Sequence, residues 1–242
     1  MVEVDADDEG ILLGRSAFET LRTYQGELFG LEPHLERLAA SCLSLEIPVC
    51  DSDRLADELI GAADQIEGEA VVRVTMTASG TRIVRSAPLP VVPSPFRCVT
   101  RPWVPPFWLD GTVKHASRAF SRMAVIDAGV EEVIWTDPDG FMLEGTRSNI
   151  FAVAQGALYT PAADGRFLGG VTRAAILDVA DELGVPVRLE PIHKNQSVDE
   201  LYVSSTLKEI TSIDQLDGEQ APGWGPVGRQ LLQGFRALVE AT

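Results

Sequence analysis

The stretch Glu144–Phe151, EGTRSNIF, interrupts a region whose neighbouring residues predict a β-sheet. EVIWTD precedes it, PDG turns the chain between the two, and IFAVAQGALYT continues from it. Strand interiors favour β-branched and aromatic residues, and Glu, Gly and Asn are depleted there. A hairpin that carries a carboxylate, two hydroxyls, an Arg and an amide in a row therefore needs a reason other than packing.

The composition is that of a globular protein with an acidic surface. The 242 residues suffice for one large domain or two modest ones, and 45% of them are hydrophobic, enough for a proper core. No apolar run approaches the roughly 18 residues that span a bilayer, and the acidic N-terminus lacks the features of a secretory signal. Cys42, Cys50 and Cys98 are widely spaced and predict free thiols in a reducing cytosol, not disulfides or a metal site. These thiols make us expect a cytoplasmic protein, and the formal net charge of −16 argues against nucleic acid or an anionic membrane as a partner.

The expected elements are mixed in order, and neighbouring strands are often joined by hairpins. This pattern favours an α/β protein with α+β mixed sheets over a doubly wound parallel sheet. The sequence predicts helices over residues 31–45, 52–66, 113–128, 172–184 and 225–240, and strands over residues 70–79 and 200–206.

A proline-rich segment with two tryptophans, residues 93–111, indicates a boundary between two domains. We expect an N-terminal α/β domain over residues 1–104, an interdomain linker over 105–112 and a C-terminal domain over 113–242.

Two places suit an anion. Gly169-Gly170 stand directly before an expected helix whose first residues are Val171 and Thr172. Exposed N–H groups at a helix start bind anions, although an ordinary glycine-containing loop with a Thr cap explains the same pattern. Arg37 lies beside the apolar stripe of another helix, where it either covers apolar surface with its stem or points at a phosphate.

A lysine and a carboxylate are the other candidates. Only three of the 20 basic residues are lysines: Lys114, Lys194 and Lys208. Lys194 and Lys208 have polar neighbours and are expected at the surface. Lys114 follows an apolar residue, so it is either another surface lysine or a partly desolvated amine with a lowered pKa that can act as a nucleophile. Glu144 needs a cationic partner, either Arg147 or the protonated nitrogen of a heterocyclic cofactor.

Taken together, a series of motifs in this order resembles one family, the class IV aminotransferases, which are the fold type IV enzymes that depend on pyridoxal 5′-phosphate (PLP). The family includes D-amino-acid and branched-chain aminotransferases and aminodeoxychorismate lyase. The resemblance covers nearly the whole chain. Its motifs are FETLR (Phe18–Arg22), HLERL (His34–Leu38), VKHASR (Val113–Arg118), EGTRSNIF (Glu144–Phe151), LGGVTR (Leu168–Arg173) and VSSTLKEIT (Val203–Thr211).

The resemblance implies a two-domain fold with PLP bound between the domains, residues 113–242 forming the PLP-binding domain, and at least a homodimer. It makes Lys114 the residue that holds the cofactor covalently and later moves a proton. It pairs Glu144 with the protonated pyridine nitrogen, which strengthens the ring as an electron sink, and it gives Asn149 the task of bracing the hairpin. The phosphate contacts that it implies are Arg37, Val171, Thr172, Ser205 and Thr206.

Two activities remain open within the family. A transaminase moves an amino group between an amino acid, D-amino acids included, and a 2-oxo acid. The alternative is a 4-amino-4-deoxychorismate lyase, which uses the same lysine to release pyruvate and 4-aminobenzoate. The R-x-H carboxylate trap of the D-amino-acid enzymes is missing here, and Arg15 and Arg82 stand near the right places. We expect these two arginines to hold substrate carboxylates across the dimer interface. Branched-chain enzymes have a Tyr where this chain has Ala119, so no motif identifies the partner of the cofactor O3′.

Overall fold

The computed structural model describes residues 3–104 and 110–241, which divide into two compact units. Unit 1 comprises residues 1–91 with the returning segment Thr112–Arg118, and unit 2 comprises Val92–Gly111 and Ala119–Ala241. Within the described ranges no helix is long and apolar enough to cross a membrane. The mixed α/β class predicted from the sequence is confirmed, and each unit has its own sheet.

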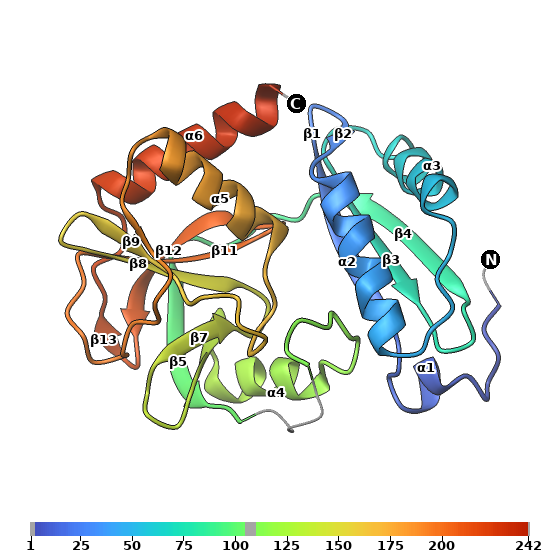
Figure 1. Cartoon of the computed structure of the whole chain (residues 1–242), viewed down its shortest axis with the longest axis horizontal. Coiled ribbons are helices and arrows are strands. Elements are labelled where there is room, and N and C mark those ends of the chain that lie inside the picture. The colour runs from blue at the N-terminus through green and yellow to red at the C-terminus, as the bar shows by residue number, and fades with distance from the viewer. Residues whose placement is uncertain (1–2, 105–109, 242) are drawn as a thin grey trace. The chain divides into compact units, whose positions relative to one another are not determined.

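Unit 1 is a four-stranded sheet with helices on one face (Figure 1). The strand order is β2-β1-β3-β4, and every pairing is antiparallel. Its elements are α1 (Glu9–Leu12), β1 (Ala17–Tyr24), β2 (Glu27–Leu28), α2 (Leu31–Ser44), α3 (Ser52–Ala63), β3 (Ala70–Met76) and β4 (Arg82–Pro88).

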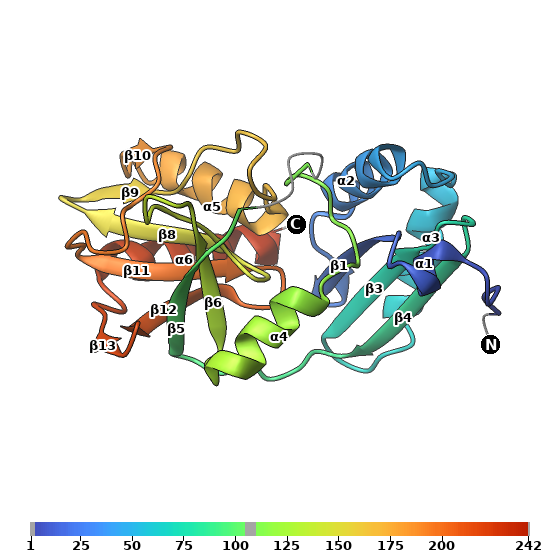
Figure 2. The same cartoon turned by 90° about the horizontal axis from the view of Figure 1, so that it is seen from below.

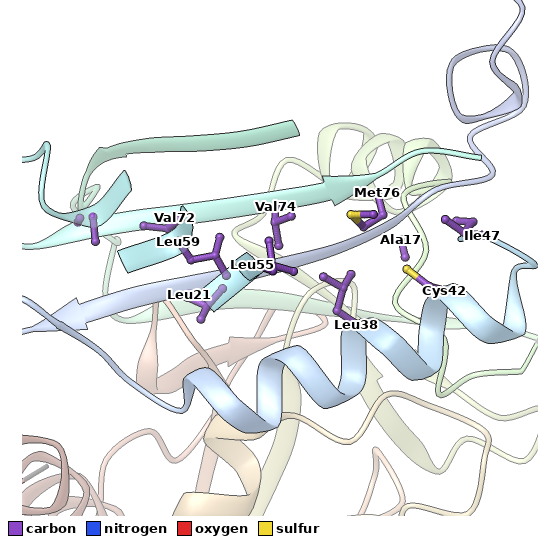
Figure 3. Close-up of a cluster of buried hydrophobic side chains, with 12 residues drawn as sticks. Ala17, Leu21, Leu38, Cys42, Ile47, Leu55, Leu59, Val72, Val74 and Met76 are labelled. Atoms are coloured by element: carbon purple, nitrogen blue, oxygen red, sulfur yellow. The ribbon is translucent and has the colours of Figure 1, made fainter. Parts of the chain in front are cut away.

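The core of unit 1 lies between this sheet and helices α2 and α3. Alternate residues of β3, such as Val72 and Val74, face the helices because side chains of a strand point to opposite faces in turn. Figure 3 shows Leu38 of α2 and Leu55 of α3 in the same cluster of buried side chains. The predicted helices over 31–45 and 52–66 are therefore confirmed, and their apolar faces position β1.

Unit 2 is built on a nine-stranded sheet. The pairings run from β8 through β11, β12, β5, β6 and β7 and back to β8, so these strands close into a barrel-like ring. Its elements are β5 (Phe96–Pro102), α4 (Ala119–Ala128), β6 (Glu132–Thr136), β7 (Met142–Gly145), β8 (Asn149–Ala154), β9 (Ala157–Tyr159), α5 (Val171–Glu182), β10 (Val187–Arg188), β11 (Glu200–Ser205), β12 (Glu209–Leu216), β13 (Glu219–Gln220) and α6 (Pro226–Ala241).

Helices cover the outside of this sheet. Helix α4 lies along β6, where Val125 packs near Val133 and Trp135 (Figure 2). Helices α5 and α6 pack against each other and against β11 (Figure 1). A cluster of buried apolar side chains of this sheet includes Phe96, Ile134 and Val203.

The two units do not divide where the sequence predicted. Residues 92–104, expected in the N-terminal domain, include β5, which lies between β6 and β12 in the sheet of unit 2. Its prolines were misleading because Pro95 precedes the strand and Pro102 ends it, so neither interrupts a ladder between them. Of the predicted linker 105–112, residues 105–109 lie outside the described residues.

The predicted helix over 113–128 is wrong in its first part. Helix α4 begins only at Ala119, and residues 112–118 run beside β1 in unit 1. In this segment the Lys114 N–H donates to Ser41 Oγ of α2 and the Ala116 N–H donates to the carbonyl oxygen of Ser16, directly before β1, instead of closing a helical turn. Lys114 therefore belongs to unit 1, not to the C-terminal unit in which the sequence placed it.

Candidate active site

Lys114 is fixed through its backbone to two elements of unit 1. Its carbonyl oxygen accepts a hydrogen bond from the Phe18 N–H at 3.0 Å, and its own N–H donates to Ser41 Oγ of α2 at 3.0 Å. The next residue, His115, forms an antiparallel bridge with Ala17. Because β3 occupies the other edge of β1 at this point, residues 114–116 take the edge that the short β2 leaves open. The lysine is thus held on a rigid strand and is half-buried.

Two cationic side chains of unit 1, those of Lys114 and Arg73, lie close to the Phe18 ring. Lys114 Nζ lies 5.0 Å from the ring centroid, and the guanidinium carbon of Arg73 lies 3.8 Å from it. Aromatic faces attract cations at such distances. Motif reasoning missed Arg73, although an Arg in the middle of the apolar strand AVVRVTM was a visible signal. A carboxylate bound near Lys114 could be met by this second positive charge.

Arg37 and His34 share a buried carboxylate. Arg37 Nε and a terminal guanidinium nitrogen donate to the two oxygens of Glu19 at 2.7 and 2.9 Å, and His34 Nδ1 lies 2.7 Å from Glu19 Oε2. Burial by itself would raise the pKa of Glu19, but the hydrogen bonds from His34 and Arg37 outweigh it and hold the pKa at about 2. Burial lowers the pKa of His34, against the opposing pull of Glu19. His34 and Arg37 both stand in the HLERL motif, whereas the sequence analysis gave no role to Glu19, a buried acid of β1 within the FETLR motif.

In unit 2, the predicted site residues Glu144 and Asn149 lie in one row across the sheet with Ser204, the residue before the predicted Ser205. Glu144 of β7 pairs with Asn149 of β8, and Asn149 pairs with Ser204 of β11. Directly paired residues of antiparallel strands point to the same face. Glu144 is half-buried, and Asn149 and Ser204 are buried. Glu144 and Asn149 of the EGTRSNIF stretch therefore form, with Ser204, a continuous polar row across the sheet.

Asn149 also ties the start of helix α5 to this row. Its Nδ2 donates to the Leu168 carbonyl oxygen at 2.8 Å. A Cβ placed on Gly170 would lie 2.2 Å from Asn149 Oδ1, so only glycine lets the helix start approach this closely. Helix α5 begins at Val171 without a side-chain cap, which leaves its first N–H groups and its dipole available to an anion. Gly170 thus does more than form a loop.

Ser205 and Thr206 follow at the end of β11, which packs against α5. They begin a tight turn, because the Lys208 N–H donates to the Ser205 carbonyl oxygen at 3.0 Å. Among the described residues, Ser204 Oγ is one of two buried side-chain oxygens without a hydrogen-bond partner. A buried hydroxyl of this kind calls for an explanation, such as a bound group.

These residues fit PLP. The uncapped helix start, with hydroxyls on β11 and its turn, suits a phosphate, and Glu144 suits a protonated ring nitrogen. In unit 1, taken by itself, Lys114 offers the primary amine that covalent attachment of PLP requires. The fit rests on the chemistry of the donors and on the unpartnered Ser204 hydroxyl.

The two predicted substrate arginines have partners within unit 1. Arg15 Nε donates to Glu9 Oε2 at 2.6 Å, and another of its nitrogens donates to the Leu45 carbonyl oxygen at 2.8 Å. Arg82 binds both oxygens of Glu58 at 2.5 Å. Their role toward substrate stays a prediction, and each guanidinium already has a carboxylate beside it.

Two other expectations change with the structure. Lys208 is not a surface lysine: it is buried and its Nζ pairs with Glu132. Arg147, which was one possible partner of Glu144, lies with its Nε 3.7 Å from Glu132 Oε2. Lys194 is exposed, as predicted.

Several known proteins with similar sequences are aminotransferases by name. A putative branched-chain-amino-acid aminotransferase of Methanocaldococcus jannaschii is 30% identical over 241 residues, covering 89% of this chain and 83% of that protein. A D-alanine aminotransferase of Staphylococcus epidermidis is 25% identical over 266 residues, covering 99% and 93%.

The fold is that of known aminotransferases. A hypothetical aminotransferase from Mycobacterium tuberculosis, solved with α-ketoglutarate and PMP bound, superimposes with a TM-score of 0.90 at 23% identity, covering 100% of this chain and 94% of that one. This likeness shows the fold, which is fold type IV. The family model described as "Amino-transferase class IV" matches residues 16–216. The chain therefore belongs to the class IV aminotransferases.

Proposed function

We propose that this class IV aminotransferase uses PLP, held by Lys114, to move an amino group between an amino acid and a 2-oxo acid. Members of the family depend on PLP. The observation that carries the proposal is the anchoring of Lys114: its backbone bonds to Phe18 and Ser41 fix its main chain at the edge of β1, and its Nζ lies 5.0 Å from the Phe18 ring centroid. A lysine whose main chain is held in this way starts its side chain from a defined position, which favours covalent chemistry at Nζ.

PLP supplies an electron sink that stabilises negative charge at the substrate Cα. Lys114 would hold the cofactor covalently through its Nζ, and its amine would be the group that takes a proton from the substrate Cα. The Glu144 carboxylate would be the residue that faces the ring nitrogen, where its negative charge would favour the protonated form of that nitrogen. Asn149 positions Glu144 and the start of α5.

The phosphate contacts in this proposal come from several residues. The N–H groups of Val171 and Thr172 donate from the start of α5, where the helix dipole favours negative charge. The hydroxyls of Ser205 and Thr206 add neutral donors. Arg37 adds a positive charge, and Glu19 fixes the orientation of its guanidinium.

Candidate substrates follow from the relatives. Branched-chain amino acids and D-alanine are the donors that the names of two relatives indicate, and α-ketoglutarate is bound in one solved neighbour. All three are aminotransferases by name, which supports transfer over the lyase alternative. Arg15 and Arg82 recognise a carboxylate of the substrate, as predicted from the sequence. Arg73 is a further candidate, because its guanidinium lies over the Phe18 ring that Lys114 Nζ also approaches. We also propose a homodimer, which light scattering on a sizing column tests.

The deciding experiment combines cofactor binding with substrate assays. The purified chain is titrated with PLP and then given D-alanine or L-leucine with 2-oxoglutarate, and separately aminodeoxychorismate. We expect a yellow protein, transamination with at least one donor, and no release of 4-aminobenzoate. Lys114→Ala should abolish borohydride fixation of PLP, whereas Lys194→Ala, which changes an exposed lysine, should leave it intact. Fixation that persists on Lys194 or Lys208 in the Lys114→Ala variant would refute the assignment.

A further inference from the structure

Glu132 is a charged side chain in the interior of unit 2. It begins β6 and its side chain is 0% exposed. Its carboxylate accepts hydrogen bonds from Thr146 Oγ1 and, at 3.0 Å, from Ser148 Oγ. It also forms an ion pair with Nζ of Lys208, whose side chain is 5% exposed. The carboxylate is therefore fully engaged by donors on other elements.

These donors come from two turns that are remote in sequence. Thr146 and Ser148 lie in the connection between β7 and β8, directly between Glu144 and Asn149. Lys208 lies in the connection between β11 and β12, directly after the residues proposed to bind phosphate. The buried Glu132 carboxylate therefore binds side chains from both turns that lie next to the residues proposed to contact the cofactor.

The backbone is shaped to allow this contact. A Cβ on Gly145 would lie 2.3 Å from Ser148 Oγ and 3.0 Å from Glu132 Cγ, so any larger residue would push the turn away from the carboxylate. The Gly145 N–H also donates to the Ser148 carbonyl oxygen at 2.7 Å, which closes the turn. The glycine of EGTRSNIF therefore serves the approach to Glu132.

Stability alone is a poor reason for this pair. Burial lowers the pKa of Lys208, while Glu132 opposes that change by its charge and hydrogen bond. Two charges that are removed from water lose hydration, and a well-packed apolar pair of similar volume is often as stable. The surroundings are suitable for such an apolar pair, since Lys208 Nζ lies 5.0 Å from the ring centroid of buried Phe96. An apolar pair forms no hydrogen bonds, so it would not hold the two turns in a defined orientation.

We propose that Glu132 and Lys208 are positioning residues that hold the Glu144–Asn149 hairpin and the Ser205–Thr206 turn in a fixed relation for cofactor binding. The inference rests on the proposed PLP function. Lys208 acts through the turn backbone, since its N–H closes the turn on Ser205 while its Nζ is anchored at Glu132. Neither residue needs to touch the cofactor.

The experiment compares PLP affinity with thermal stability in three variants. Lys208→Met removes the anchor of the turn but keeps the length of the side chain. Glu132→Gln/Lys208→Met removes both charges, and its amide still reaches Thr146 and Ser148. Lys194→Met makes the same chemical change at an exposed lysine of unit 2 and serves as the matched control. PLP binding is followed by absorbance, and unfolding by circular dichroism without cofactor.

We expect Lys208→Met to lower both the melting temperature and the affinity for PLP, because it leaves the buried Glu132 charge with only the more distant Arg147, at 3.7 Å, as a cationic partner. The double variant should regain the melting temperature yet bind PLP about tenfold more weakly, which corresponds to one lost phosphate contact. Lys194→Met should match the wild type. A double variant with wild-type affinity would overturn the positioning role, since charge balance would then suffice. A wild-type chain that binds no PLP would refute the proposed function and this inference with it.

Discussion

Arg37 donates two hydrogen bonds to Glu19, one to each carboxylate oxygen, at 2.7 and 2.9 Å. The carboxylate side chain is 1% exposed, so helix α2 and strand β1 are joined by a buried ion pair. The same helix bonds to the Lys114 backbone through Ser41. A phosphate contact from Arg37 therefore depends on Glu19 for its direction.

Glu19→Gln tests this dependence. Removing one partner of a buried ion pair costs about 3–5 kcal/mol, because the other charge remains without compensation. We expect a loss of that order in the free energy of unfolding, measured by urea denaturation, and weaker binding of PLP. Glu58→Gln is the matched control, since Glu58 binds Arg82 in the same two-pronged way but is 34% exposed. An exposed pair contributes about 0–1 kcal/mol. Equal losses in the two variants would contradict the special place of Glu19.

Acid should destabilise the protein through His115. Burial, helped by the charge of Arg118, lowers the pKa of His115 from 6.5 to about 4. The unfolded chain therefore binds the proton more readily than the folded one. The resulting stability is present above pH 6.5 and is lost as the pH falls toward 4. His34 contributes in the same direction, because its folded pKa is also lowered.

The measurement is the free energy of unfolding between pH 7.5 and 5. The wild type should lose about 2 kcal/mol through His115 over this range. His115→Gln should show a shallower pH profile, whereas His193→Gln, which changes the half-buried histidine of unit 2, should keep the wild-type slope. A wild-type slope in the His115→Gln variant would show that this histidine does not sense the pH.

The sequence identified the polar turns better than it identified the strands around them. EGTRSNIF was conspicuous because Glu, Gly and Asn are depleted in strands, and LGGVTR because two glycines stand directly before a helix. The sequence analysis did not recognise strand β5, because the segment around it is rich in proline. Proline content alone does not say whether a proline lies inside a strand ladder or at its ends. The segment after residue 112 was misread as helix because its pairing partner, β1, lies almost a hundred residues earlier in the chain.

The candidate site was predictable only where a motif was local. Lys114 and Glu144 stand in recognisable strings, and so does Arg37. Glu19 and Arg73 act through partners on other strands, and such pairs become visible only when the register is known. Lys208 was judged by its sequence neighbours, which are polar, although its side chain points into the core. Burial of a charge depends on a distant counter-charge, here Glu132.

Three arginines of unit 1 can be ranked by one assay. The sequence predicts that Arg15→Ala and Arg82→Ala each lower kcat/KM for 2-oxoglutarate tenfold to a hundredfold, which matches the roughly 1.5–3 kcal/mol of a charge-assisted bond. In the structure both have acidic partners, whereas Arg73 lies over the ring that also faces Lys114. We expect Arg73→Met to cause the largest loss, with the affinity for PLP unchanged. Losses confined to Arg15 and Arg82 would restore the sequence-based assignment, and no loss in any variant would remove all three from substrate binding.

Gly170 and Gly169 provide a sharp test of how α5 approaches the polar row. A Cβ at Gly170 would lie 2.2 Å from Asn149 Oδ1, whereas at Gly169 the nearest contact would be Ala163 Cβ at an ordinary 3.9 Å. The φ of Gly170 is −76°, which suits any residue, so the effect of Gly170→Ala comes from the clash and not from backbone strain.

We expect Gly170→Ala to displace the Asn149 amide or the start of α5, at a cost of about 1–3 kcal/mol in the free energy of unfolding. Because Asn149 stands beside Glu144 and the helix start is the proposed phosphate contact, the affinity for PLP should fall as well. Gly169→Ala keeps the same loop one residue earlier and should change neither quantity by much. Calorimetry of unfolding and absorbance titration with PLP measure the two effects. If both alanine variants behave alike, the close contact between Asn149 and the start of α5 does not control the cofactor site.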